Sequence, residues 1–262
     1  MHKVRIESVM VKQPLLNTSV NNINMRETVD EIEKMILLGR ESYIVPINVD
    51  VVIKIEKDAY LKRIVDNADM VLVDGQPLIW ISKWHRRPVC ARISGSDLVP
   101  ALCEKASQKG YSVFIIGGKE GVAEKAKANL EKLYAGIHIA GTYSPPFGFE
   151  NDEDEIEKIN YMIKDRHADI LIACFGCPKQ EKWIYENYKK YGVKVSVCAG
   201  ATVDFLAGNV KRAPKWMSDH GLEWLYRFCQ EPKRLFKRYF IDDIRIVGLV
   251  IKYRNRKQKQ NA

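Results

Sequence analysis

The sequence predicts an α/β fold with a mostly parallel sheet covered by helices on both faces. Five short apolar runs rich in Val and Ile have the composition and length of buried strands, at residues 43–47, 70–73, 113–116, 170–175 and 193–197. Amphipathic stretches with helical spacing lie between them, at residues 98–109, 121–133 and 153–164. Because strands that alternate with helices at this spacing build βαβ units, we expect one mostly parallel sheet.

Residues 142–151 predict a loop, since Pro145, Pro146 and Gly148 block regular structure. The first ten residues lack the long apolar core of a secretory signal, so we expect a cytosolic protein with reduced thiols. Cys174 and Cys177 form a C-x-x-C pair, but no second pair lies at zinc-binding spacing. Buried structural cysteines are therefore favoured over redox or zinc chemistry.

The positive charge of the chain is concentrated in its last fifth. The 262 residues carry a net charge of +9, and the 14 Lys/Arg and five Asp/Glu from residue 211 onward account for all of it. We therefore expect a neutral catalytic or binding body at residues 1–210 and a basic appendage at residues 211–262 that meets an anionic partner.

Apolar side chains alternate with the cations of this appendage at helical spacing. They are Leu225, Phe228, Leu235, Phe236, Tyr239, Phe240, Ile244 and Val247. The pattern suits an amphipathic helix pair at an anionic membrane surface, and the apolar content after Tyr239 favours lipid over nucleic acid as the partner. The longest apolar stretch, residues 246–251, falls far short of the roughly 20 residues that span a bilayer. A homo-oligomer joined through the apolar face stays open as an alternative.

Polar residues and glycines follow several of the predicted strands directly. In open parallel sheets, ligands bind beyond the carboxyl ends of the strands, so these residues predict one ligand-binding crevice. They are Asn48, Asp74, Gly75, Gly117, Gly118, Gln180, Glu181 and Asp204, joined by Arg92, Ser94, Gly95 and Asp97 from a segment that precedes a helix.

Three of these positions have two readings each. Asp74 suits a general base at the end of a strand, or equally an N-cap for the helix begun by Pro77. Arg92 suits a diphosphate ligand, although a lone arginine is more often a surface ion-pair partner. The Ser94 to Asp97 segment offers a phosphate site at a helix N-terminus, or a plain helix start.

Several enzyme classes lack their motif in this sequence. There is no G-x-G-x-x-G for a dinucleotide and no G-x-x-x-x-G-K-[ST] for a P-loop. Asp152 and Asp154 form a D-x-D, the spacing with which many sugar transferases hold a divalent cation. Here the pair opens an acidic first helical turn, so a favourable interaction with the helix dipole is the better explanation.

These motifs, in this order, resemble the WecG/TagA/CpsF family of bacterial glycosyltransferases. The matching elements are Asn48, the Ala68-Asp69 to Trp80 segment with Asp74-Gly75, Arg92 with Ser94 to Asp97, Gly117-Gly118, Gly176-x-Pro178-Lys179-Gln180-Glu181, Gly200-Ala201-x-x-Asp204-Phe205, Arg212-Ala213-Pro214 and Gly221-Leu222-Glu223-Trp224-Leu225-x-Arg227. Each motif is weak alone, but the ordered set spans roughly residues 43–240 and is highly specific.

The resemblance implies an inverting, metal-independent transferase that needs no cofactor. It would move a hexose or N-acetylhexosamine from a UDP-sugar donor to a polyprenyl-diphosphate-linked sugar, with undecaprenyl as the lipid, in the synthesis of exopolysaccharide, capsule or teichoic acid. The resemblance also implies a Rossmann-like body and an appendage that closes the active site. The protein would be peripheral, at the cytoplasmic face of the cell membrane.

Residue roles also follow from the resemblance. The general base falls on Asp74, and contacts to the nucleotide sugar fall on Asn48, Arg92 and Gln180. Arginines that face the diphosphate fall near Arg227, Arg234 and Arg238, with Lys237 competing with Arg238 for one place.

Two departures from the family's teichoic-acid members concern the donor side. Those members commonly carry Thr-Pro-Asn where this chain has Pro46-Ile47-Asn48, and Pro-Asp-Gly-Ile-Gly where it has residues 73–77, Val-Asp-Gly-Gln-Pro. These departures weaken the expectation of N-acetylmannosamine as the donor sugar, and a glucose-type donor becomes an alternative. The remaining alternatives are an N-acetylmannosaminyltransferase of the teichoic-acid type and a nucleotide-binding membrane adaptor without chemistry.

Overall fold

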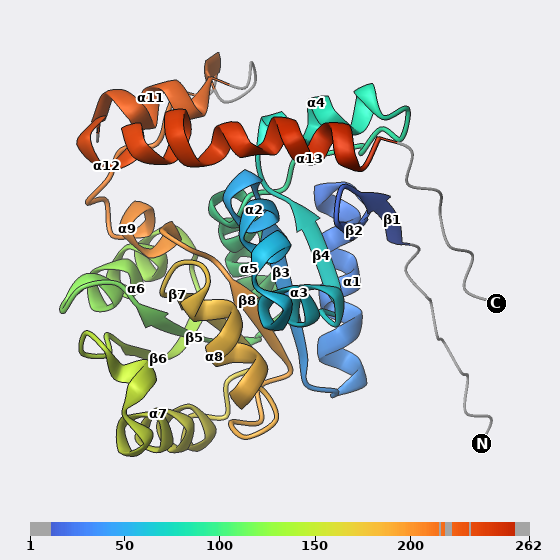
Figure 1. Cartoon of the computed structure of the whole chain (residues 1–262). Coiled ribbons are helices and arrows are strands. Elements are labelled where there is room, and N and C mark those ends of the chain that lie inside the picture. Colours follow the sequence, from blue (N-terminus) through green and yellow to red (C-terminus); the bar gives the residue numbers. More distant parts are fainter. Residues whose placement is uncertain (1–11, 215, 218–221, 231, 255–262) are drawn as a thin grey trace, which may run out of the picture.

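The computed structural model describes residues 12–254 apart from 215, 218–221 and 231 (Figure 1). The strands are β1 (Lys12–Leu15), β2 (Thr18–Asn21), β3 (Ser42–Ile47), β4 (Met70–Val73), β5 (Ser112–Gly117), β6 (His138–Tyr143), β7 (Ile170–Cys174) and β8 (Val195–Cys198). The helices up to the end of the sheet are α1 (Met25–Leu38), α2 (Val49–Lys57), α3 (Ala59–Asp66), α4 (Gln76–Trp84), α5 (Gly95–Lys109), α6 (Val122–Leu133), η1 (Phe149–Asn151), α7 (Glu153–Asp165), α8 (Lys179–Asn187) and α9 (Thr202–Leu206).

Six of the strands form one parallel sheet in the order β4-β3-β8-β7-β5-β6. The predicted α/β fold with a mostly parallel sheet is thus confirmed, and each of the five predicted strands is present within one or two residues of its expected bounds. The expected loop at residues 142–151 is wrong at both ends, because Thr142 and Tyr143 belong to β6 and residues 149–151 form a 3-10 turn.

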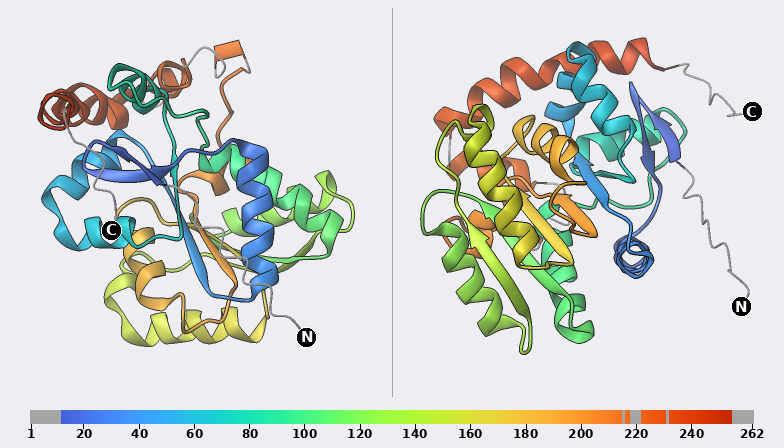
Figure 2. Two further views of the ribbon diagram at one scale, coloured as in Figure 1. Left: turned by 90° about the vertical axis from the view of Figure 1, so that its right-hand side faces the viewer. Right: turned by 90° about the horizontal axis from the view of Figure 1, so that it is seen from below.

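The two faces of the sheet carry separate buried clusters. Successive strand residues point to opposite faces, so Phe114 and Ile116 of β5 enter one cluster while Val113 and Ile115 enter the other. The first cluster is covered by α2, α3, α7 and α8, and the second by α1, α5, α6 and α9. Figure 2 shows these helices on both sides of the sheet.

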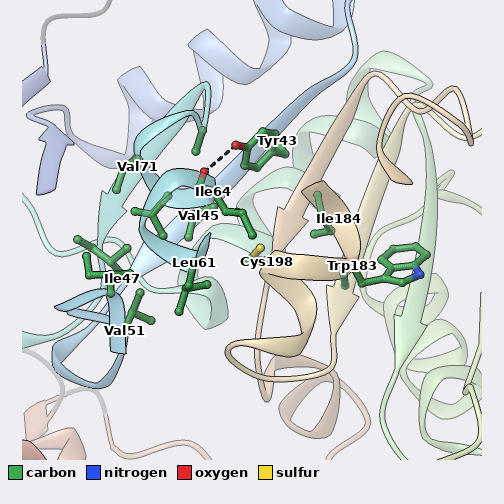
Figure 3. Packing of buried hydrophobic residues seen from close by; sticks show 14 of the residues in the cluster. Tyr43, Val45, Ile47, Val51, Leu61, Ile64, Val71, Trp183, Ile184 and Cys198 are labelled. Carbon is green, nitrogen blue, oxygen red and sulfur yellow. Dashed lines mark hydrogen bonds between the residues drawn. The ribbon is translucent and has the colours of Figure 1, made fainter. Parts of the chain in front are cut away.

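The first cluster also contains a buried polar anchor. Tyr43 is fully buried, and its hydroxyl donates a hydrogen bond of 2.6 Å to the carbonyl oxygen of Ile64 in α3 (Figure 3). Because a buried hydroxyl is costly without a partner, this bond fixes how α3 lies against β3.

A short antiparallel hairpin, β1–β2, lies beside the edge strand β4. The side-chain oxygen of Asn21 accepts a hydrogen bond of 2.8 Å from the backbone N–H of Val71, and the ammonium of Lys12 donates to the carbonyl oxygen of Ala68. The hairpin therefore covers an edge that would otherwise expose unpaired backbone groups.

The C-terminal segment is helical and lies across the carboxyl end of the sheet (Figure 1). It consists of α11 (Glu223–Gln230), α12 (Pro232–Lys237), the π-helical turn η2 (Arg238–Asp242), the 3-10 turn η3 (Asp243–Arg245) and α13 (Ile246–Lys252). Among the residues described, no helix has the length and apolar character needed to cross a membrane.

The far end of this segment is packed into the body. Val250 of α13 is buried in the first cluster, and Ile246, Leu249 and Tyr253 pack against that cluster. Glu56 of α2 accepts hydrogen bonds from the ammonium of Lys252 and the hydroxyl of Tyr253. Apolar burial and a polar contact thus hold α13 against the body.

Candidate active site

A pocket lies at the carboxyl ends of β3, β4, β7 and β8. It is lined by Pro46, Asn48, Asp50, Val51, Asp74, Ser94, Gly95, Ser96, Gly176, Cys177, Gln180, Glu181, Cys198, Ala199, Gly200, Ala201, Thr202 and Phe205 of the body, and by Glu223, Leu235 and Tyr239 of the C-terminal segment. The sheet and the C-terminal segment therefore build one site together.

The topology explains why the pocket opens here. The neighbouring strands β3 and β8 are followed by helices on opposite faces, α2 on the face of the first cluster and α9 on that of the second. The two connections diverge, and a crevice opens between the strand ends, as parallel sheets show at a switch point of this kind. Asn48 after β3 and Gly200 after β8 line its two sides.

Asp74 directly follows β4 and lines the pocket. Its backbone N–H donates a hydrogen bond of 2.7 Å to the carbonyl oxygen of Ile47, which ties it to the end of β3. The next helix, α4, begins at Gln76 with Gly75 as its N-cap and with no side-chain cap. The N-cap position of α4 thus falls on Gly75 and not on Asp74, where one interpretation had expected it.

Gly75 and Gly95 are required by the backbone at the pocket. Gly75 has φ of +131°, a conformation that other residues rarely adopt. A Cβ atom on Gly95 would lie 3.0 Å from the carbonyl oxygen of Ala199, so glycine lets α5 start close to the loop after β8 without displacing that loop.

Arg92 is held by two carboxylates and is only 19% exposed. Its Nη1 donates to Glu223 Oε2 at 2.8 Å, and its Nη2 lies 3.4 Å from Asp97 Oδ2. Burial disfavours the charge of the guanidinium, but the hydrogen bond to Glu223 and the negative charges of Glu223, Asp97 and Asp74 outweigh burial and raise the pKa of Arg92. Arg92 is thus an ion-pair partner, as one interpretation expected, but a half-buried one. It does not line the pocket itself and is joined to the lining through Glu223.

Ser94 caps α5 and orders the residues around Arg92. Its Oγ accepts from the backbone N–H of Asp97 and donates to Asp97 Oδ2 at 2.6 Å. Asp97 is also paired with the guanidinium of Arg212. Burial raises the pKa of Asp97, but the hydrogen bonds from Ser94 and Arg212 outweigh burial, so the pKa lies below its usual value.

Gln180 and Glu181 at the start of α8 form a fixed pair. The backbone N–H groups of Gly176 and Gly200 both donate to Gln180 Oε1, and Gln180 Nε2 donates to Glu181 Oε1 at 2.9 Å. These bonds set the orientation of the Gln180 amide. Glu181 is fully buried, and burial raises the pKa of its carboxyl group.

Six predicted site residues whose side chains the structure describes do not line the pocket: Gly75, Arg92, Asp97, Gly117, Gly118 and Asp204. Arg92 and Asp97 lie behind the lining, where Arg92 is bonded to the lining residue Glu223 and Asp97 to the lining residue Ser94. At Gly117 a Cβ atom would lie 2.5 Å from the carbonyl oxygen of Cys174, and at Gly118 it would crowd Val122 and Val203. Close packing of β5 against β7 therefore explains Gly117, and close packing against α6 and α9 explains Gly118. The backbone of Asp204 accepts hydrogen bonds from the N–H groups of Asn209 and Val210.

The three predicted arginines of the appendage lie on described helices. Arg227 belongs to α11, Arg234 to α12 and Arg238 to η2. Their side chains lie outside the part of the chain that the structure describes, so their roles stay predictions.

The structure adds Glu223, Leu235 and Tyr239 to the site. The sequence pattern places Leu235 and Tyr239 on an amphipathic helix, but nothing in that pattern links them to the crevice. Glu223 belongs to one of the motifs that match the family. Its charge also sets it apart, because it is one of only five acidic residues in a basic segment.

Asp152 is the N-cap of α7 and accepts a hydrogen bond from the backbone N–H of Glu155, and Asp154 lies in the first turn of that helix. This is the placement at the helix terminus that the sequence analysis favoured. No group of three or more potential metal-ligating His, Cys, Asp or Glu side chains occurs within the described ranges, and neither Asp152 nor Asp154 lines the pocket.

The comparisons with known proteins give the class of the chain and then its family. The chain is 31% identical over 196 residues to the N-acetylglucosaminyldiphosphoundecaprenol N-acetyl-beta-D-mannosaminyltransferase of Bacillus spizizenii, a match that covers 75% of this chain and 74% of that enzyme. The protein is a glycosyltransferase. Residues 13–260 match the glycosyl transferase WecG/TagA/CpsF family, and the chain belongs to this family.

Proposed function

We propose that the protein transfers a hexose or N-acetylhexosamine from a UDP-sugar to an undecaprenyl-diphosphate-linked sugar during the synthesis of a cell-surface polysaccharide. The name of the Bacillus enzyme supports the acceptor class, because that enzyme acts on an N-acetylglucosaminyl-diphosphoundecaprenol. The position of Asp74 carries the proposal. Asp74 lines the pocket with Asn48 and Gln180, directly follows β4, and its carboxylate lies within electrostatic reach of Arg92.

The proposed reaction is a single in-line displacement with inversion at the anomeric carbon. Asp74 accepts the proton of the acceptor hydroxyl while the acceptor oxygen bonds to that carbon. The bond from this carbon to the donor diphosphate breaks, and UDP leaves with the electron pair. Arg92 stabilises the charge that develops on the diphosphate, a task that a metal ion performs in other transferases.

The donor sugar is proposed to differ from that of teichoic-acid relatives. The residues that depart from their pattern, Pro46 and the segment after Asp74, lie at the ends of β3 and β4 next to the pocket. A glucose-type donor fits this difference. N-acetylmannosamine is the alternative, and it is the sugar named for the Bacillus enzyme.

We propose that residues 211–262 act as an appendage that brings the body, residues 1–210, to the cytoplasmic face of the membrane. Five apolar side chains spaced three or four residues apart point outward from the C-terminal segment and are 50–67% exposed: Phe236, Phe240, Ile244, Val247 and Ile251. We call them the outer stripe. Their neighbours Leu235 and Tyr239 line the pocket instead.

The outer stripe and the charge of the segment together suit an anionic lipid surface. Apolar side chains interact with the acyl chains and the surrounding Lys and Arg interact with lipid phosphates. The same helices would then rest on lipid with one side and close the pocket with the other.

The test is transfer to a synthetic polyprenyl-diphosphate-linked N-acetylglucosamine, read by mass, with a panel of UDP-sugars. Asp74→Asn should lower turnover by about 10²–10⁴-fold, because a general base contributes about that much, and should leave UDP affinity nearly unchanged. Unchanged turnover would remove Asp74 from the role of base. UDP binding without transfer from any donor would favour the adaptor.

Asp69→Asn is the matched control. Asp69 directly precedes β4 and accepts a hydrogen bond from the backbone N–H of Tyr43, at the opposite end of the strand from Asp74. The same chemical change at that end should leave the turnover of folded protein unchanged.

A further inference from the structure

The ion pair between Arg92 and Glu223 joins the body to the C-terminal segment at the pocket. The bond from Arg92 Nη1 to Glu223 Oε2 is 2.8 Å long, and the two side chains are 19% and 15% exposed. The two residues are 131 positions apart in the chain. Glu223 lies in the first turn of α11 and lines the pocket, while the proposed mechanism gives it no part.

A carboxylate and a phosphate are equivalent partners for a guanidinium group. Both present oxygens at the spacing of two N–H donors, and both form strong charge-assisted hydrogen bonds with arginine. Glu223 lines the pocket and Arg92 lies directly behind it, so a guanidinium that holds this carboxylate is already arranged to hold an anionic ligand in its place.

We propose that the carboxylate of Glu223 and the diphosphate of the donor nucleotide occupy the same place on Arg92, so that donor binding displaces Glu223. The inference rests on the proposed function, because it takes a nucleoside diphosphate as the ligand. It makes Glu223 an internal competitor that sets the affinity of the site.

The charges around Arg92 support displacement over simultaneous binding. Three carboxylates (Asp74, Asp97 and Glu223) and two guanidinium groups (Arg92 and Arg212) are linked here by ion pairs or electrostatic interaction, with a formal sum of −1. A diphosphate with two further negative charges would be repelled by this set. Once Glu223 leaves, the formal charges of the remaining four groups sum to zero. The Nη1 group of Arg92, which had donated to Glu223, is then available to the diphosphate.

The other contacts of Arg92 show why Glu223 is the carboxylate that leaves. The carboxylate of Asp97 accepts a hydrogen bond from Ser94 and is paired with Arg212, and the backbone N–H of Asp97 donates to Ser94 Oγ. Asp97 also lies farther from Arg92, at 3.4 Å, than Glu223 does at 2.8 Å. In the structure as described, Arg92 is the only cation paired with Glu223. Displacement of Glu223 therefore breaks one ion pair, whereas displacement of Asp97 breaks a network.

A competing interpretation is that Glu223 orients Arg92 for the ligand. The two interpretations predict opposite signs for the same variant. If Glu223 competes with the diphosphate, Glu223→Gln removes the competitor and tightens nucleotide binding. If Glu223 orients Arg92, the variant loosens the guanidinium and weakens binding.

The experiment is titration of UDP and of uridine into the full-length protein by calorimetry. For Glu223→Gln we expect about three- to tenfold tighter binding of UDP, the range set by a half-buried, charge-assisted pair. Binding of uridine, which has no phosphate, should not change. Unchanged or weaker UDP binding in this variant would overturn the proposal.

Two further variants exclude other causes. Asp242→Asn removes one negative charge from the same segment at a residue that does not line the pocket, and it should leave UDP affinity unchanged; equal tightening would mean a general charge effect and would overturn the proposal. In an Arg92→Gln background, Glu223→Gln should give no gain. If the wild type and Glu223→Gln both fail to bind UDP while remaining folded, the proposed function itself fails.

Discussion

The two ends of the C-terminal segment are attached to the body in different ways. At α13 the attachment is largely apolar, with Val250 buried at 8% exposure and Ile246 and Leu249 packed against the first cluster. At α11 the attachment includes a polar contact with the body, the Arg92–Glu223 pair, whose Glu223 lines the pocket.

This difference matters because ligands compete with only one kind of contact. An anionic ligand exchanges readily with a carboxylate on an arginine, since one charge-assisted bond replaces another. No such exchange exists for buried Val and Leu side chains, whose stabilisation comes from removal of apolar surface from water. The α13 end thus acts as a fixed attachment, and the α11 end is the part that responds to what the pocket holds.

The largest effect is expected from breaking the apolar attachment. Val250→Asp places an unpaired charge where α13 meets the first cluster, which should cost about 2 kcal/mol or more of folding free energy and lower Tm by roughly 4–8 °C. Thermal unfolding measures the change, and amide hydrogen exchange should show faster exchange in α13.

Val247→Asp is the matched control on the same helix. Val247 is 56% exposed in the outer stripe, so the same substitution should change Tm little and instead weaken binding to anionic liposomes. Equal loss of Tm in both variants would contradict the assignment of inner and outer faces. A shift of Val247→Asp from dimer to monomer in light scattering, without loss of liposome binding, would instead make the outer stripe a contact between two copies.

A smaller effect is expected from the polar part of the α13 attachment. Burial raises the pKa of Glu56, but hydrogen bonds from Lys252, Asn17 and Tyr253 outweigh burial, so its pKa lies below the usual 4.5. A depressed folded-state pKa adds stability that is present above pH 4.5 and is lost as the pH falls through the folded-state value. The difference in Tm between wild type and Glu56→Gln should therefore be present at pH 7 and shrink at pH 3.5.

Glu120→Gln serves as the comparison for this pH series. Glu120 is exposed, and its neutralisation should change Tm little at either pH. A Glu56 difference that grows in acid would show that hydrogen bonding to the ionised carboxylate is not what Glu56 contributes.

The smallest effect is expected far from both attachments, at the N-terminus of α7. Replacement of both Asp152 and Asp154 by Asn keeps the helix cap, since Asn caps about as well as Asp, and costs only about 0.3–1 kcal/mol of dipole interaction per charge. Transfer activity, measured with and without a chelator, should be unchanged. Activity that requires Mg²⁺ or Mn²⁺ and disappears in this variant would make these carboxylates metal ligands after all.

The sequence predicted the parts of the fold that depend on local composition. Strands buried on both faces are continuous apolar runs, and β3, β4, β5, β7 and β8 were found for that reason. Strand β6 was missed because it is an edge strand with one exposed and several half-buried residues, and its Gly141 packs against the ring of Phe114. The β1–β2 hairpin was missed because a partner strand distant in sequence holds it.

The same distinction applies to the pocket. Asn48, Asp74, Ser94 and Gln180 were predicted to gather because each follows a strand or starts a helix, and the structure places all four in one lining. The pairing of Arg92 with Glu223 depends on how the C-terminal segment folds back over the body. No local pattern contains that information.

The C-terminal segment is one helix thick. Residues that face the pocket and residues that face away from it follow one another along this segment. Leu235 and Tyr239 line the pocket, while Phe236 and Phe240 are exposed on the outer surface. A helix with its side chains is about 10–12 Å across. A lipid surface against the outer stripe would thus lie about that far from the pocket, within reach of a diphosphate and one sugar. The lipid chain of the acceptor would then stay in the bilayer throughout the reaction. The lipid-linked product would leave along the plane of the membrane, and UDP would leave into water.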